Sequence, residues 1–162
     1  MYPLLVFLHV IGVFGFLMAH GVSAGVAFRL RSERTPDKVR ALLELSGASY
    51  PVMYRCLLLL LILGIVLGFM GSWWGRAWIW VSLILIVALV MAMGRLGGAV
   101  YSQARKLAGL PYAVFGKPYP AVEPASPAEL HAVLAQGNPM LLTVIGFGGI
   151  AVIAWLMMFK PF

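Results

Sequence analysis

Two histidines in the apolar N-terminal segment are the residues whose chemistry this sequence places most unusually. His9 and His20 both lie in FLHVIGVFGFLMAHGVSAGVAF, residues 7–28, which contains no charged residue. Eleven residues advance a helix by three turns plus roughly 20°, so both imidazoles fall on one face, about 16 Å apart along the axis. We therefore expect this face to point into a helix bundle rather than toward lipid.

An imidazole inside a membrane span is costly, and it marks a functional site by default. Histidine is a usual axial ligand of haem iron, so we expect His9 and His20 to be iron ligands, with haem b as the cofactor. Two other uses stay open. Each ring can be neutral and hydrogen-bonded to another helix, or it can transfer protons.

A haem held by one of these histidines needs further groups from other spans, because one helix cannot supply both axial ligands across about 16 Å. Arg55 and Arg95 lie near the inner ends of the second and third spans, where they can pair haem propionates or extend into solvent. The methionines at matching depth are Met70 and Met157 near His9, and Met53, Met91 and Met93 near His20.

The composition indicates that the elements holding these residues cross a membrane. Of the 162 residues, 62% are hydrophobic and only 10% are charged, and the mean hydropathy is +0.97. About 20 apolar residues span the hydrocarbon core as a helix, and backbone groups in lipid must be paired. We predict an all-α fold, a single transmembrane domain over residues 1–162, with spans at about 4–28, 52–70, 77–94 and 140–159. Because MYPLLVF has no basic residue, we interpret the first span as retained rather than cleaved.

The charges predict how the spans are oriented. Ten of the 12 Lys and Arg residues lie in or beside the connections 29–51 and 95–139, and only Arg76 and Lys160 lie elsewhere. This bias places both long connections in the cytoplasm and both termini outside. We therefore expect a multi-pass protein of the cell membrane, of the prokaryotic cytoplasmic type. The lipid bilayer, and not nucleic acid, is the expected partner of the net charge of +7.

The first connection predicts a short interfacial helix, capped by Thr35, with Pro36 at its first position and Gly47 at its end. The turn GSWWGR joins the second and third spans, and its four neighbouring tryptophans, Trp73, Trp74, Trp78 and Trp80, predict an aromatic belt at the outer interface.

The second long connection should begin as a helical continuation of the third span and then break. The segment LPYAVFGKPYPAVEPASP contains five prolines, so we predict a linker without regular structure. A short helix follows, with Ser126 as its cap, Glu129 completing a capping box and Gly137 ending it. His131 lies in this helix, where we expect it to be solvated or interfacial.

Small residues predict where helices approach closely: Gly21 with Gly25, Gly64 with Gly68, and Gly146 with Gly148 and Gly149. The single cysteine, Cys56, excludes an internal disulfide and is expected to pack as a small apolar residue. We find no Ser/His/Asp set, no cysteine cluster and no phosphate-cradling loop, so no catalytic residue is predicted.

The stretch LLVFLHVIGVFGFL resembles a pattern shared by CopD-type copper-resistance membrane proteins, HemJ-type protoporphyrinogen oxidases and an uncharacterised family of four-helix integral membrane proteins. The resemblance covers residues 1–105 and is greatest to the uncharacterised family. It implies that His9 matches a first-helix histidine that is a candidate haem ligand in HemJ-type enzymes. Phe16 stands where those relatives usually have tryptophan, and Gly25 where they have arginine, so the resemblance does not carry the oxidase activity.

Three functions follow from these observations. The first is a haem b-binding protein that transfers electrons within the membrane, with quinone as a candidate partner, as a small subunit of a respiratory complex. The second is a non-catalytic accessory subunit that assembles with other membrane subunits of a respiratory or photosynthetic complex. The third is a transporter of copper or another small solute.

Overall fold

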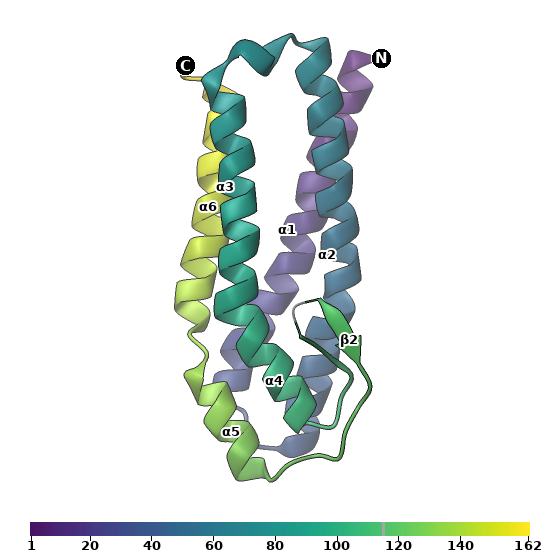
Figure 1. Cartoon of the computed structure of the whole chain (residues 1–162), viewed down its shortest axis with the longest axis vertical. Coiled ribbons are helices and arrows are strands. Elements are labelled where there is room, and N and C mark those ends of the chain that lie inside the picture. The colour runs from purple at the N-terminus through teal and green to yellow at the C-terminus, as the bar shows by residue number, and fades with distance from the viewer. Residues whose placement is uncertain (115) are drawn as a thin grey trace.

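The computed structural model describes residues 1–114 and 116–162, and it confirms an all-α architecture of long apolar helices (Figure 1). Four helical segments are long and apolar enough to cross a membrane. They are α1 (Tyr2–Ser32), α2 (Pro36–Met70), α3 (Ala77–Met93) with its helical extension to Leu107, and α6 (Pro139–Phe159).

The two ends of the molecule differ in composition. We call the end that holds both termini and the 3-10 turn η1 (Trp73–Gly75) the tryptophan end. The opposite end, called the basic end, holds the α1–α2 turn and the whole connection from α3 to α6 (Figure 1). The two long connections therefore lie together, opposite both termini, which is the arrangement that the charge bias requires.

The four long helices are arranged as two pairs. Helix α1 packs along α2, and α3 packs along α6, whereas α1 and α6 share a much smaller contact and α2 and α3 face one another with at most a marginal one (Figure 1). Glycines permit both close pairings: Gly15 lies against Cys56, and Gly149 lies against Leu89. The predicted approach at Gly21 and Gly25 is wrong, because no other atom of the described residues would meet a Cβ at either position.

Helix α2 runs without a break from Pro36 to Met70, so the separate interfacial helix predicted at its start does not exist. Gly47 does not end a helix, and the guanidinium of Arg105 occupies the space beside its Cα. Pro51 lies inside the helix. Nearby, the Ser49 hydroxyl donates to the Ser46 carbonyl one turn earlier, at 2.7 Å. Thr35 occupies the N-cap position without a side-chain capping bond.

Beyond α3 the chain stays helical, as predicted, but it passes through the π-helix η2 (Gly94–Gly98) before α4 (Ala99–Leu107). A π turn pairs residues five apart, so it shifts the face that the following residues present. Helix α3 therefore faces α6, whereas α4 faces α5 and the basic-end half of α2.

The proline-rich linker contains a small antiparallel hairpin, although no regular structure was predicted there. Strand β1 (Tyr112–Val114) pairs with β2 (Lys117–Tyr119), and the rings of Tyr112 and Tyr119 stack at 5.3 Å. Pro118 is tolerated because a two-stranded hairpin has only edge strands. The next helix, α5 (Pro127–Gln136), has the predicted capping box at Ser126 and ends at Gly137.

The basic end has its own apolar core, which ties both helix pairs together. Leu30, Val39 and Leu43 are almost fully buried there. The buried residues of this core are Val26, Leu30, Val39, Leu43, Ala104, Ala108, Leu110, Leu130, Val133 and Leu134. Arg105 of α4 donates from Nη1 to the Leu43 carbonyl at 2.6 Å and from Nε to the Pro111 carbonyl at 2.8 Å. This end thus resembles a small soluble core attached to the spans.

The tryptophan end departs in part from the predicted aromatic belt. Trp80 is 52% exposed, as a belt residue should be. Trp78 is only 2% exposed, and it forms a core with Ile79 and Leu156 between α3 and α6. Its side chain therefore packs the helix pair rather than reaching the interface.

Candidate imidazole site in the membrane spans

His9 lies in the contact between α1 and α2. A Cβ atom added to Gly64 would lie 3.2 Å from the His9 Cε1, so the ring occupies the space that this glycine leaves. Its Nδ1 atom is buried and has no hydrogen-bond partner within residues 1–114 and 116–162. His9 is therefore enclosed by the most extensive of the contacts that α1 makes with other helices.

His20 lies in the smaller contact, between α1 and α6. A Cβ atom added to Gly146 would lie 2.5 Å from Nε2, so the nitrogen points at the bare backbone of α6. The ring stacks on Phe16, with centroids 5.8 Å apart and planes at 8°, and it contacts Phe147 at 5.0 Å. The residue is only 8% exposed, and Nε2 has no hydrogen-bond partner among the described residues.

The two imidazoles were expected on one face of α1, pointing into one bundle interior. They contact different helices instead, because the side of α1 that meets α2 near the tryptophan end meets α6 nearer the basic end. The structure therefore does not bring His9 and His20 together, and it defines two separate imidazole environments. Of these, only the His20 environment joins the two helix pairs.

Several of the groups expected to complete a haem site are exposed or pack elsewhere. Arg55 and Arg95 are exposed on α2 and in η2, and neither forms an ion pair within the described chain. Met157 packs beside the Trp78 core, and Met70 and Met91 are about half exposed. Residues 1–114 and 116–162 contain no group of three or more His, Cys, Asp or Glu side chains that could hold a metal ion.

A serine cluster between α1 and α2 escaped the sequence analysis. Ser23 and Ser49 are 2.8 Å apart between hydroxyl oxygens, and the Ser46 hydroxyl donates to that of Ser23 at 3.4 Å. Ser46 and Ser49 are both buried. Ser46 and Ser49 are three residues apart, a spacing that places two side chains on one face of a helix. This signal was missed because both residues fall in the segment 29–51, which was predicted to be a connection.

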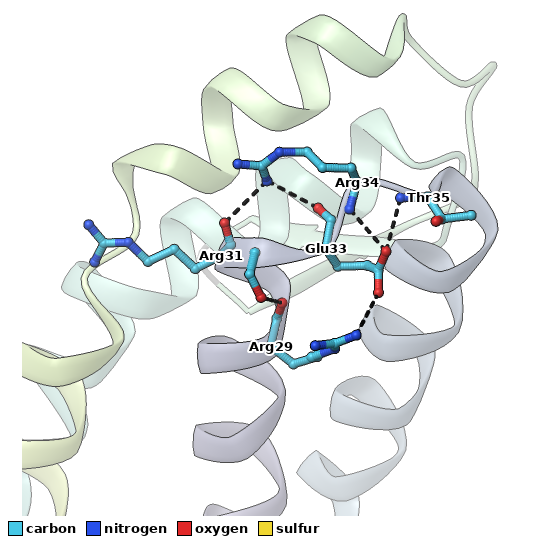
Figure 2. A network of polar contacts seen from close by, with 6 residues as sticks. Arg29, Arg31, Glu33, Arg34 and Thr35 are labelled. Atoms are coloured by element: carbon cyan, nitrogen blue, oxygen red, sulfur yellow. Dashed lines mark hydrogen bonds and ion pairs between the residues drawn. The ribbon is translucent and has the colours of Figure 1, made fainter.

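The turn between α1 and α2 is organised by one carboxylate. Glu33 accepts hydrogen bonds from the backbone N–H groups of Arg34 and Thr35 at 3.0 and 3.1 Å, and it pairs with Arg29 at 3.2 Å (Figure 2). The backbone donors of Thr35 and then Arg34 hold the pKa of Glu33 at about 2, well below its ordinary value. His131 of α5 approaches the Arg34 carbonyl with Nε2 at 3.3 Å, so it joins α5 to this turn rather than facing only solvent.

The fold defined by these elements is that of a multi-pass α-helical membrane protein, in which one unpartnered imidazole lies between two helix pairs. Comparisons with protein-family models, with curated proteins and with solved structures find no match to this chain.

Proposed function

We propose that this chain is an integral membrane haem b-binding protein that transfers electrons within the bilayer, with His20 as the axial ligand. The observation that carries the proposal is the buried Nε2 of His20, which has no hydrogen-bond partner among the described residues. Buried polar atoms are nearly always paired, so an unpaired one requires an explanation. A ligand that takes the imidazole lone pair supplies that explanation.

The surroundings of His20 fit an imidazole ligand of haem in their chemistry. Phe16 and Phe147 flank the ring and hold its plane, and Gly146 places no side chain opposite Nε2. Because the α6 backbone lies directly against this nitrogen, a group bound there requires α6 to move away from α1. The α1–α6 contact is less extensive than the α1–α2 contact, so a group at His20 separates fewer residues than a group at His9 would.

When bound, haem b supplies a one-electron carrier whose potential depends on its axial ligands and on its burial. The protein's own residues would orient the imidazole and exclude water from it. His9 is the second candidate ligand, supported by the resemblance of the first helix, but it is enclosed in the extensive α1–α2 contact. Quinone is the proposed redox partner, because both imidazoles lie within helices that cross the lipid.

The experiment is an absorption spectrum of the purified full-length protein, as isolated and after addition of haemin. We expect a Soret band that His20→Ala removes and that His131→Ala, which changes a histidine outside the spans, retains. Loss of the band in His9→Ala alone would move the ligand to His9. A folded wild-type protein that stays colourless with added haemin would refute the proposal.

A second candidate is an accessory subunit of a larger respiratory or photosynthetic membrane complex. The specific observation is that α2 and α3 face one another across the spans with at most a marginal contact, which leaves the faces of both pairs available to other helices (Figure 1). Extraction in a mild detergent and native electrophoresis should then recover the chain in a large assembly. A chain that migrates only as a small species would argue against this candidate.

A further inference from the structure

A hollow of about 510 Å³ lies at the tryptophan end, between the α2–α3 turn and the last turn of α6. It is independent of both imidazoles. Its lining combines two cations with two indole rings, and consists of Gly71, Ser72, Trp73, Arg76, Trp78 and Lys160.

The charge of this hollow is not compensated by any acidic side chain. Of the 12 Lys and Arg residues in the sequence, Arg76 and Lys160 are the two that lie neither in nor beside the connections 29–51 and 95–139, and both line the same hollow. All five acidic residues lie between positions 33 and 129, and none lines it. Two like charges repel each other, so holding them around one space favours an anion there. The main-chain oxygen of Phe162 lies at this end too, where it accepts a hydrogen bond from the Trp78 N–H at 3.5 Å.

Aromatic contacts hold one of these cations in place. The Lys160 Nζ lies 4.1 Å from the centroid of the Trp73 ring and 5.8 Å from that of Trp78. Trp78 is buried in the α3–α6 core, so its ring is a fixed support. Lys160 is exposed, and these contacts hold its ammonium group beside the indole rings that line the hollow.

The backbone around the hollow adopts a conformation that its residues disfavour. Ser72 has φ 54° and Lys160 has φ 46°, and these are the only non-glycine residues with positive φ within residues 1–114 and 116–162. Both line the hollow. Ser72 directly follows the C-cap of α2, and Lys160 is the C-cap of α6 with its N–H bonded to the Leu156 carbonyl, so both left-handed turns end helices at the border of the hollow.

We propose that this hollow binds the phosphate group of an anionic phospholipid. Arg and Lys are the side chains that recognise phosphate oxygens. The hollow lies at the tryptophan end of the spans, which also carries the exposed Trp80, at the level where tryptophans meet lipid headgroups. A lipid held there would tie the α2–α3 turn to the end of α6. A free phosphate shares this chemistry but lacks the acyl chains that the neighbouring apolar surface would contact.

The test is native mass spectrometry of the full chain, released from micelles after equilibration with phosphatidylglycerol or with phosphatidylcholine. We expect the wild type to retain one phosphatidylglycerol in preference to phosphatidylcholine. The double variant R76Q/K160Q should bind it about tenfold more weakly, because each cation near a headgroup contributes on the order of a few-fold in affinity. The conservative pair R76K/K160R should retain it.

The matched control is K106Q/K117Q, which removes the same charge at the basic end, where Lys106 also lies over an aromatic ring, that of Tyr112. This control should bind phosphatidylglycerol as the wild type does. Three results would each overturn the proposal: no lipid preference in the wild type, equal loss in the control, or full displacement of the lipid by millimolar inorganic phosphate. The first of these needs no variant, so the test stands even if R76Q/K160Q does not fold.

Discussion

The contact between His20 and Gly146 predicts an unusually large effect of adding a single methyl group. Gly146→Ala would place its Cβ 2.5 Å from Nε2, whereas ordinary van der Waals contact begins near 3.4 Å, so the ring or α6 must move by about 1 Å. The ring cannot rotate away freely, because Phe16 and Phe147 flank it. Overpacking of this kind costs about 1–3 kcal/mol of unfolding free energy.

Gly148→Ala is the matched control on the same helix, because no other atom of the described residues would lie near its Cβ. Both variants replace glycine by alanine within a helix, which favours folding by up to about 1 kcal/mol. The difference between them isolates the steric term. We therefore expect Gly146→Ala to be less stable than Gly148→Ala by about 1–3 kcal/mol.

The assay is unfolding of the purified protein by titration with sodium dodecyl sulfate, followed by tryptophan fluorescence and helical circular dichroism. Combining Gly146→Ala with His20→Ala removes the ring that the methyl group would strike. The two changes should then be non-additive by about the same 1–3 kcal/mol. Equal stability of Gly146→Ala and Gly148→Ala, or strict additivity with His20→Ala, would refute the packing described for His20.

Three further predictions concern the polar groups at the basic end. The pKa of Glu33 is near 2 in the folded protein and near 4.5 ordinarily, so its contribution to stability is present above about pH 4.5 and is lost as the pH falls toward 2. Glu33→Gln should therefore weaken the pH dependence of the melting temperature between pH 4.5 and 2. A pH dependence equal to that of the wild type would contradict this. Arg105→Gln removes two hydrogen bonds from a charged donor, so it should lower the free energy of unfolding by about 1–3 kcal/mol and speed proteolysis of the proline-rich linker. The control Lys106→Gln changes an exposed side chain and should have little effect on either measurement. Ser49→Ala should cost about 0.6 kcal/mol in the same detergent titration and should be non-additive with Ser23→Ala; full additivity would show that the hydroxyl pair contributes nothing.

The four long helices were predictable because long uninterrupted runs of apolar residues mark them in the sequence. Runs of about 20 apolar residues can only be helical in lipid, and the helices end within a few residues of the expected limits at Met70, Met93 and Phe159. The capping box at Ser126 was predictable for the opposite reason, because it is local and needs only residues 126 to 129.

The features that escaped prediction depend on tertiary contacts. Gly47 was predicted to end a helix within the connection 29–51, but α2 continues through Gly47 and Pro51, and the Arg105 side chain packs beside Gly47 from a helix nearly sixty residues away. Helical periodicity correctly related His9 to His20, but it cannot say which helix lies opposite each residue. That depends on how α1 crosses its neighbours, and this crossing assigns His9 to α2 and His20 to α6.

The π-helix η2 sets the rotation of α4 relative to α3 within the continuous helical segment Ala77–Leu107. Its wider turn holds about one residue more than a regular ladder, an offset of roughly 100° in the helical wheel. A deletion of one residue among Gly94–Gly98 that restored the regular ladder would swing Ala104 and Arg105 out of their core, while the seam between α3 and α6 kept its alignment. The π-helix η2 thus allows α3 and α4 to present different faces to their neighbours, although they belong to one continuous helical segment.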